Sequence, residues 1–252
     1  MSDRATGTPA AGSDPTNDRA FLMALRLSDS FLPVGTYTSS YGVEQYVNEG
    51  RLETVDELGT LVEGYLRRLV GPADLVALGA AHGATADGAL ERAFAADERL
   101  HAATLPAEFR TSSTKAGTQL LDLLEDTDGD LVFDTALDGV AADYATAVDA
   151  GGTPAHYAVV LGIVSQRADI GRANACHLHA YSFVTELLGA AQRLGSFGHT
   201  AIQSQLAALL PVVEDVCDQH VDASLDTLSS FAPMAEIMGM HHERADRRLF
   251  MS

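Results

Sequence analysis

The sequence predicts an all-α protein: a single domain built from several helices. Apolar residues recur at steps of three and four along most of the chain, which is the spacing of one face of an α-helix. Helix start signals precede several of these segments, whereas the alternation typical of a β-strand occurs only at residues 131–133. With 252 residues, 46% of them hydrophobic, the chain is long enough to bury one large core.

The clearest helix of the first half follows residue 54. Thr54 and Glu57 have the spacing of a capping box, and the apolar residues after them share one helical face. We expect an interruption at Gly71 and Pro72, because both residues disfavour a helix interior, and then another helix through His82. Pro106 suits a first helical position and a Thr-Pro pair at 153–154 a helix start. Further helices are expected at 90–101, 106–125 and 153–168, with an acidic loop at 126–138.

The second half contains the longest apolar stretch, residues 173–194, which we expect to be the central buried helix. Thr200 and Gln203 have capping-box spacing and predict the start of the next helix. Pro211 is expected to kink or end that helix, since proline lacks the amide hydrogen that a helix interior uses. A last helix is expected to reach Phe231.

The two ends differ in composition from the middle. Residues 1–18 are rich in small and polar residues and predict a disordered tail, followed by a helical domain over 19–232. Residues 233–252 are both apolar and rich in arginine, which is typical of a segment that docks on another protein. The sequence therefore predicts one folded domain between two tails.

The chain is strongly acidic. It has 35 acidic and 16 basic residues, a formal net charge of -19, and Lys115 as its one lysine. Such a charge repels phosphate backbones and anionic lipids, so we expect neither nucleic acid nor a membrane surface as a partner. The composition favours adaptation to high salt, where repulsion between carboxylates is screened.

The cysteines and the N-terminus favour a cytoplasmic protein. Cys176 and Cys217 are the two cysteines, and they have neither metal-site nor disulfide-framework spacing, although pairing between them stays open. The first residues lack the apolar segment of a secretory signal, and no apolar run is long enough to cross a bilayer.

Motifs for catalysis and metal binding are incomplete. Lys115 is not preceded by a glycine-rich turn, so there is no phosphate-binding loop of the P-loop type. His242 and Glu243 begin a pattern close to the zinc motif H-E-x-x-H, but Asp246 replaces the second histidine. No histidine pair has the i, i+4 spacing that places two imidazoles at one metal ion, and His177 and His179 are expected to point to different sides of a helix. We therefore expect neither a dedicated metal site nor a cofactor.

Four ordered segments carry a family resemblance. Near the start the chain has L-P-V-G-T-Y-T-S-S-Y-G-V-E, ending at Glu44, and near the end it has M-H-H-E-R-A-D-R-R-L-F-M-S, beginning at Met240. Between them lie a segment with Glu108, Arg110, Ser113 and Gly117, and another from Tyr181 to Gln203 in which Phe183, Glu186 and His199 depart from the family's usual residues. In these segments the chain resembles the urease accessory protein family UreF.

The resemblance implies a bundle of about ten helices and a non-catalytic role in urease maturation. It implies a homodimer that binds UreD, also called UreH, and the GTPase UreG on the urease apoprotein, and that supports GTP-dependent nickel insertion. It also implies that the C-terminal tail becomes ordered on its partner. The residues expected to contact partners are Tyr41, Glu44, Arg193, His199, Gln203, His241, His242, Glu243, Arg247, Arg248, Leu249 and Phe250.

Two other functions stay open at the level of the sequence. One is a small helical metal-dependent hydrolase, and the other is a nickel-binding protein, in each case using His242, Glu243 and Asp246. The sequence does not decide nickel affinity, the oligomeric state, or the direction of any effect on the GTPase.

Overall fold

The computed structural model describes residues 15–35, 40–125, 137–195 and 197–244, and within these ranges the regular structure is entirely helical. The all-α prediction is confirmed. Residues 131–133 and most of the acidic loop lie outside the described ranges. The helices are α1 (Pro15–Leu27), α2 (Val43–Asn48), α3 (Val55–Tyr65), the π-helix η2 (Leu66–Leu75), α4 (Val76–Ala86), α5 (Leu90–Ala103), α6 (Ala107–Glu125), α7 (Gly139–Asp149), α8 (Tyr157–Arg167), α9 (Arg172–Arg193), α10 (His199–His220), the 3-10 helix η3 (Leu225–Thr227) and α11 (Pro233–His242).

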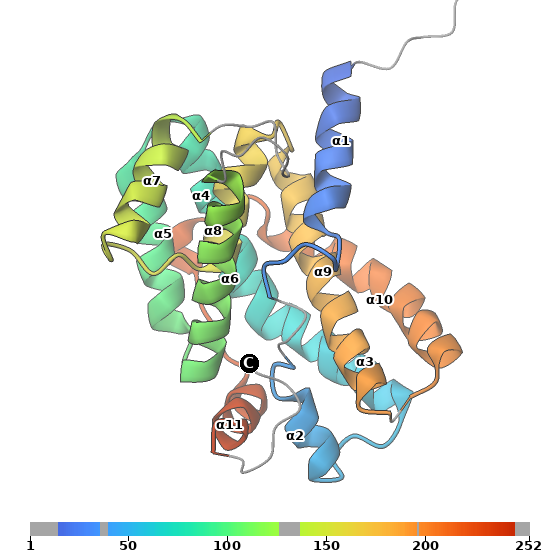
Figure 1. Ribbon diagram of the computed structural model, residues 1–252. Coiled ribbons are helices and arrows are strands. Elements are labelled where there is room, and N and C mark those ends of the chain that lie inside the picture. Colours follow the sequence, from blue (N-terminus) through green and yellow to red (C-terminus); the bar gives the residue numbers. More distant parts are fainter. Residues whose placement is uncertain (1–14, 36–39, 126–136, 196, 245–252) are drawn as a thin grey trace, which may run out of the picture.

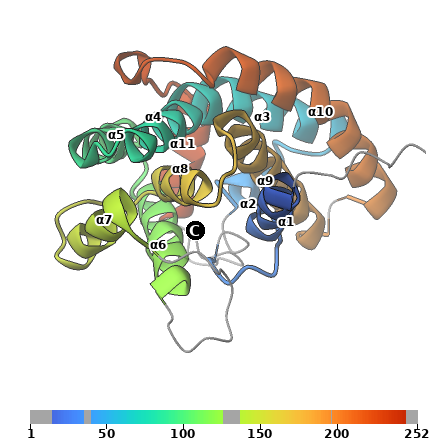
Figure 2. The ribbon, with the colours of Figure 1, turned by 90° about the horizontal axis from the view of Figure 1, so that it is seen from above.

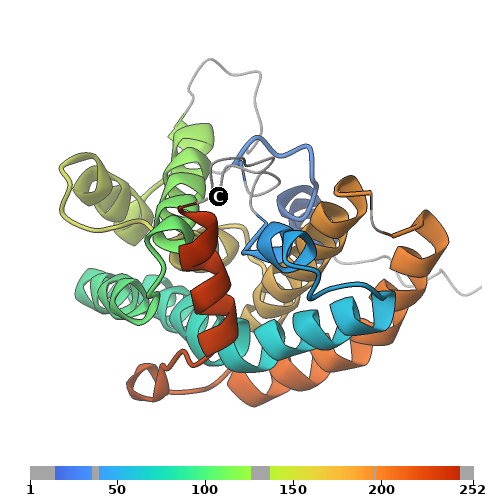
Figure 3. The same ribbon diagram turned by 90° about the horizontal axis from the view of Figure 1, so that it is seen from below.

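The helices form two groups around α8 and α9. α4, α5, α6 and α7 lie on one side of the molecule with α8, while α3 and α10 pack with α9 on the other (Figures 1 and 2). α2 and α11 lie against each other at one end of the bundle, which Figure 3 shows from below, and α1 lies against α9 toward the opposite end. None of the described helices combines the length and apolar character needed to cross a membrane.

The innermost helix is α8, which is more completely covered than the segment we predicted to be central. Every residue from Tyr157 to Ser165 is buried. α9 is the long helix expected at 173–194, and most of it is buried, but Tyr181 on its outer face is exposed. Gly162 permits the packing of α8 on α4, because a side chain there would begin 2.4 Å from the carbonyl oxygen of Leu78.

The predicted start of α3 is confirmed, while the predicted interruption at Gly71 and Pro72 is wrong. Thr54 and Glu57 form both hydrogen bonds of the capping box. The chain then continues through η2 into α4 without leaving a helical path. Gly71 serves packing there, since a side chain at this position would meet Val216 of α10 at 2.6 Å.

Pro72 has a specific structural consequence. Proline has no amide hydrogen, so Pro72 donates no backbone hydrogen bond inside the π-helix η2. Carbonyls of η2 instead accept hydrogen bonds from the segment before α11: the backbone N–H of Phe231 donates to Arg68 (3.1 Å), and that of Ser229 donates to Pro72 (3.1 Å). The segment that leads into α11 is therefore attached to η2.

Two further boundary predictions are wrong. Pro211 does not end α10, which runs unbroken to His220, and no α-helix follows it to Phe231. The carbonyl that Pro211 leaves without a helical donor belongs to Ala207, an exposed residue, so water can hydrate it. Gly198 rather than Thr200 caps α10, without a side-chain cap.

The starts of α6, α8 and α1 also differ from the predictions. α6 begins one residue after Pro106, and α8 begins at Tyr157 rather than at 153–154. Thr153 and Ala155 instead direct their polar hydrogens to Asp97 of α5, and Ala155 adopts a left-handed φ of 65°, which a helix start would not allow. α1 begins at Pro15, so the last residues of the predicted tail are helical, while residues 1–14 lie outside the described ranges.

Candidate functional site

Three of the motif segments meet in one buried contact. Glu44 comes from α2, Glu108 from the first turn of α6, and His242 from the last turn of α11. The imidazole of His242 lies between the two carboxylates, with Nδ1 2.7 Å from Glu108 Oε1 and Nε2 3.0 Å from Glu44 Oε2. The three residues are 2%, 6% and 0% exposed, in the order Glu44, Glu108 and His242. We refer to these three residues as the His242 junction.

The junction favours a protonated imidazole. A neutral histidine donates one hydrogen bond, whereas the imidazolium donates from both nitrogens and so satisfies both carboxylates. The hydrogen bond to Glu108 raises the pKa of His242 above its ordinary value; burial opposes this, and the bond to Glu44 adds to it. The positive charge therefore belongs to the closed junction.

The residues beside His242 extend this contact. Glu243 accepts a hydrogen bond from the backbone N–H of Glu108 (2.8 Å), which satisfies a free amide at the start of α6. His241 points the other way, to the exposed side, where its Nδ1 lies 3.2 Å from Oε1 of Glu49, the residue that follows α2. The divergence of His241 and His242 that the sequence predicts is thus present.

Glycines and aromatic rings form the apolar floor under α11. Gly42 and Gly239 bring α2 and α11 together, since a Cβ at Gly42 would lie 3.2 Å from the backbone nitrogen of Gly239. The ring of Tyr41 packs between those of Phe109 and Phe183, with both centroids 5.0 Å away. Tyr41 has a left-handed φ of 45°, and its carbonyl accepts a 2.6 Å hydrogen bond from the hydroxyl of Tyr65.

The outer face of α11 is apolar. Met234, Ile237 and Met240 follow one another at steps of three and are 46%, 39% and 36% exposed, whereas Met238 on the inner face is buried. Apolar side chains that are exposed together on one face mark a surface for contact with another protein.

Comparison with known proteins shows the family of this chain. The family model of UreF matches residues 52–210. The chain belongs to the UreF family. A urease accessory protein UreF from Trichodesmium erythraeum is 31% identical over 230 residues, which cover 91% of this chain and 95% of that protein. UreF proteins from Corynebacterium efficiens and a Nostoc strain are 26% and 28% identical over 92% and 93% of this chain, and 96% and 97% of their own. The predicted resemblance is confirmed.

The residues that the UreF resemblance marks as partner contacts fall into separate groups. Tyr41, Glu44, His241, His242 and Glu243 lie at the junction of α2, α6 and α11. In Figures 1 and 3 the connection between α9 and α10 lies apart from α11. Glu44 and His242 are buried, so a partner reaches them only if α11 moves, and direct contact by them stays a prediction. The remaining residues are Arg193, His199 and Gln203, which are exposed around that connection, and Arg247, Arg248, Leu249 and Phe250, which lie outside the described residues.

Sequence reasoning did not include Glu108 in the predicted site. Glu108 matches a UreF motif, but no local pattern connects it with His242, 134 residues later. The part of the tail from Pro233 to His242 is a helix in the single chain, whereas we expected the tail to become ordered on a partner.

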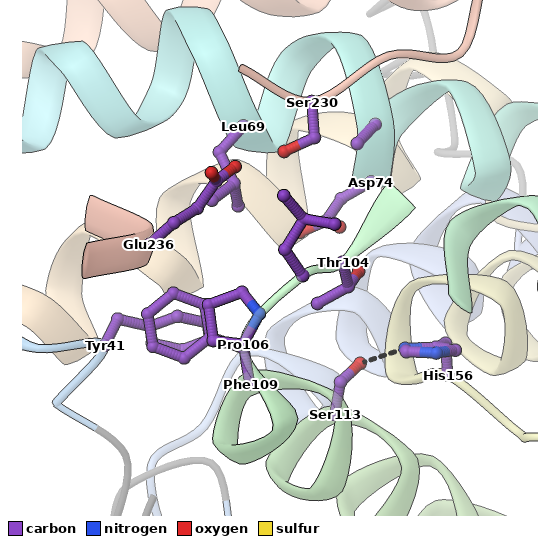
Figure 4. A pocket seen from close by; sticks show the side chains of 12 residues that line it. Tyr41, Leu69, Asp74, Thr104, Pro106, Phe109, Ser113, His156, Ser230 and Glu236 are labelled. Carbon is purple, nitrogen blue, oxygen red and sulfur yellow. Dashed lines mark hydrogen bonds between the residues drawn. The ribbon is translucent and has the colours of Figure 1, made fainter. Parts of the chain in front are cut away.

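The UreF resemblance also does not predict a small chamber beside Tyr41 and Phe109 (Figure 4). Two cavities of about 30 and 20 Å³ share Tyr41, Asp74 and Ser113 in their walls. His156 Nδ1 lies 3.0 Å from Ser113 Oγ, its Nε2 lies 3.0 Å from His101 Nδ1, and burial lowers the pKa of His156 to about 4.

The chamber is too small to be an active site. Cavities of this size hold about one or two water molecules each, whereas substrate pockets are on the order of hundreds of cubic ångströms. The contact between Ser113 and His156 therefore has no space for an acyl group that a serine nucleophile would attack. We interpret it as part of a hydrogen-bond network inside the bundle.

The junction does not have the geometry of a metal centre. Its carboxylates approach opposite nitrogens of one imidazole, so the three groups cannot converge on one ion. Within the described part of the chain, no group of three or more His, Cys, Asp or Glu side chains is arranged to hold a metal. His177 and His179 do diverge, since His179 is buried beside Asp74 while His177 bonds its own helix. Asp246 lies outside the described residues.

We expect Gly42→Ala to destabilise the α2–α11 contact by about 2–3 kcal/mol. Alanine is strained at the left-handed φ of this position, and its methyl group would press against the backbone of Gly239. Gly88→Ala is the matched control, since Gly88 also has a positive φ, of 67°, but faces open space. Its stability should fall only by the cost of the strained backbone, about 1 kcal/mol. Urea unfolding followed by circular dichroism measures both. Equal losses in the two variants would show that the approach to Gly239 contributes nothing.

Proposed function

We propose that this protein is a non-catalytic scaffold of urease maturation. It binds UreD (UreH) and the GTPase UreG on the urease apoprotein as a cytoplasmic homodimer, and it supports GTP-dependent insertion of nickel. The observation that carries this proposal is the match to urease accessory proteins over almost the whole chain. The scaffold uses the free energy of binding its partners to hold the GTPase and urease together, so its contribution to nickel insertion is positional.

The outer face of α11 is the surface we assign to UreD. It presents Met234, Ile237 and Met240 on a helix whose two ends are attached, through Phe231 to η2 and through His242 to α2 and α6. A pre-positioned apolar helix loses less conformational entropy on binding than a free segment does. Arg247, Arg248, Leu249 and Phe250 extend this assignment as predictions from sequence.

Point variants test this assignment better than deletion of the tail. Deletion after Phe231 would remove Met238 from the core and uncover Glu44 and Glu108, so loss of binding could reflect a damaged fold. Ile237→Asp places a charge on the outer face and leaves the inner face intact. We expect it to weaken capture of UreD by roughly tenfold or more, as for a central interface residue.

The control is Leu210→Asp, which introduces the same charge at an exposed leucine of α10. UreD, mixed with the purified chain in high salt, should be captured by wild type and by Leu210→Asp but poorly by Ile237→Asp. UreG and urease subunits should accompany wild type when native extract is used. Equal capture by all three chains would remove α11 as the docking surface.

The geometry supports neither of the two alternative functions. A hydrolase or nickel site at His242 and Glu243 needs ligand atoms that are open to a metal, whereas both nitrogens of His242 already contact carboxylates and Glu243 accepts from α6. The purified chain should therefore hydrolyse no small substrate at a rate that depends on His242.

A further inference from the structure

α11 is attached at both ends, and the two attachments differ in kind. At its start, backbone hydrogen bonds from Ser229 and Phe231 connect the preceding segment to η2, and these bonds carry no titratable group. At its end, the fully buried polar attachment is the contact of His242 with Glu44 and Glu108, which depends on the charge of the imidazole. The hydrogen bond from the N–H of Glu108 to Glu243 and the contact of His241 with Glu49 lie beside it. The apolar stripe assigned to UreD lies between these two points.

We propose that His242 is a charge-dependent positioning residue: the protonated imidazole holds the end of α11 between Glu44 and Glu108, and loss of that proton releases it. The inference rests on the proposed function, because the release matters for docking only if the outer face of α11 contacts UreD. With α11 seated, Met234, Ile237 and Met240 face outward together. When the end of α11 is released, the helix can move, and these three side chains no longer keep the fixed arrangement that docking requires.

The neutral imidazole does not fit the closed junction. It would donate to one carboxylate and turn a lone pair toward the other, in a place that water does not reach. Among the described residues, Glu108 Oε2 has no hydrogen-bond partner, so Glu108 has no second contact to replace the lost one. Removing one partner of a buried ionic contact is strongly destabilising, because the remaining charge stays buried.

The charged surroundings favour the cation further. Around His242, carboxylates outnumber cations on α2, α6 and α11. The guanidinium of Arg110 on α6 donates to the carbonyls of Thr104 and Leu105 and not to Glu44 or Glu108. Tyrosine hydroxyls are neutral over the same pH range. The titratable and charged groups near His242 on these elements are Glu44 and Tyr46 of α2, Tyr41 and Glu49 on either side of α2, Glu108 and Arg110 in the first turn of α6, Glu236 and His241 of α11, and Glu243 and Arg244 directly after α11.

The sign of the pH effect follows from the raised pKa of His242. Stability from a group with a raised folded-state pKa is fully present below its unfolded pKa and is lost as the pH rises through the folded value. α11 should therefore be seated in mildly acidic solution and should be released progressively as the solution becomes alkaline.

Amide hydrogen exchange of the full chain, measured by mass spectrometry and divided by the intrinsic rate at each pH, tests the release. Between about pH 6 and about pH 9, we expect the protection of α11 in wild type to fall by roughly tenfold, while that of α8 does not change. Glu108→Gln should abolish this fall, because its amide can donate to the neutral imidazole. His177→Gln, on α9 and outside the His242 junction, removes a histidine that bonds its own helix and should behave as wild type.

Capture of UreD over the same pH range tests the consequence for docking. Capture should decline with rising pH for wild type and His177→Gln, and should stay level for Glu108→Gln. If α11 exchanges alike in wild type and Glu108→Gln, or if capture has the same pH dependence in both, the positioning role is overturned while the scaffold function stands. If UreD is captured at no pH, the proposed function fails, and the exchange measurement still decides whether His242 holds α11.

Discussion

Gly117→Ala should destabilise the protein by about 3 kcal/mol or more, because the added methyl group would overlap backbone atoms of the segment that leads into α8. Gly117 lies on α6, and its Cβ would lie 1.9 Å from the carbonyl oxygen of Ala155 and 3.1 Å from the carbonyl carbon of His156. That backbone has little freedom to move, since the N–H groups of Ala155 and His156 both donate to the carboxylate of Asp97. α6 and α8 would have to separate.

Gly64→Ala is the control with the opposite expected sign. Gly64 lies in the interior of α3, and a Cβ there meets no atom within 4 Å. Alanine has a higher helix propensity than glycine, so this variant should gain about 0.5–1 kcal/mol. Urea unfolding at one high salt concentration measures both variants. A loss of less than about 1 kcal/mol for Gly117→Ala would mean that the helices separate easily and that the contact is not tight.

Asp97→Ala should cost about 4 kcal/mol or more, because it leaves four buried donors without their acceptor. Asp97 Oδ2 accepts from the hydroxyls of Tyr144 (2.7 Å) and Thr153 (2.6 Å) and from the N–H of Ala155 (2.7 Å), while Oδ1 accepts from the N–H of His156 (2.9 Å). Burial raises the pKa of Tyr144, so its hydroxyl stays a donor.

The measurement for Asp97→Ala is again the free energy of unfolding, with Asp143→Ala as the control. Asp143 is an exposed aspartate on α7, one residue before Tyr144, and its removal should change stability by less than about 0.5 kcal/mol. Similar values for the two variants would show that water or a rearranged loop replaces Asp97 at no cost. The expected difference would make Asp97 the residue that fixes the entry into α8.

Local patterns predicted those parts of the fold that neighbouring residues decide. The capping box of Thr54 and Glu57 and the apolar face of α3 involve residues three or four apart, and both are present. The errors occur where a distant segment competes with a local preference. Thr153 and Pro154 have the form of a helix start, but the hydrogen bonds to Asp97, more than 50 residues earlier, hold Thr153 and Ala155 outside the helix.

Proline shows the same limit of local reasoning. Pro72 was predicted to interrupt a helix because it has no amide hydrogen, yet the chain passes through it as a π-helix whose Arg68 carbonyl accepts a hydrogen bond from the backbone of Phe231. At Pro211 the corresponding carbonyl lies on an exposed turn, so water can serve. Both prolines therefore remain inside helical paths.

The sequence by itself determined the helical class, most helix positions and membership of the UreF family, because these depend on local spacing and on motif order. Only the tertiary structure decided that Glu44, Glu108 and His242 form one contact, which joins residues 134 and 198 positions apart. It also decided that His242 faces inward while Ile237 faces outward. The physical reason is that a buried ionic contact depends on which helices pack together, and the periodicity of a single helix carries no information about its neighbours.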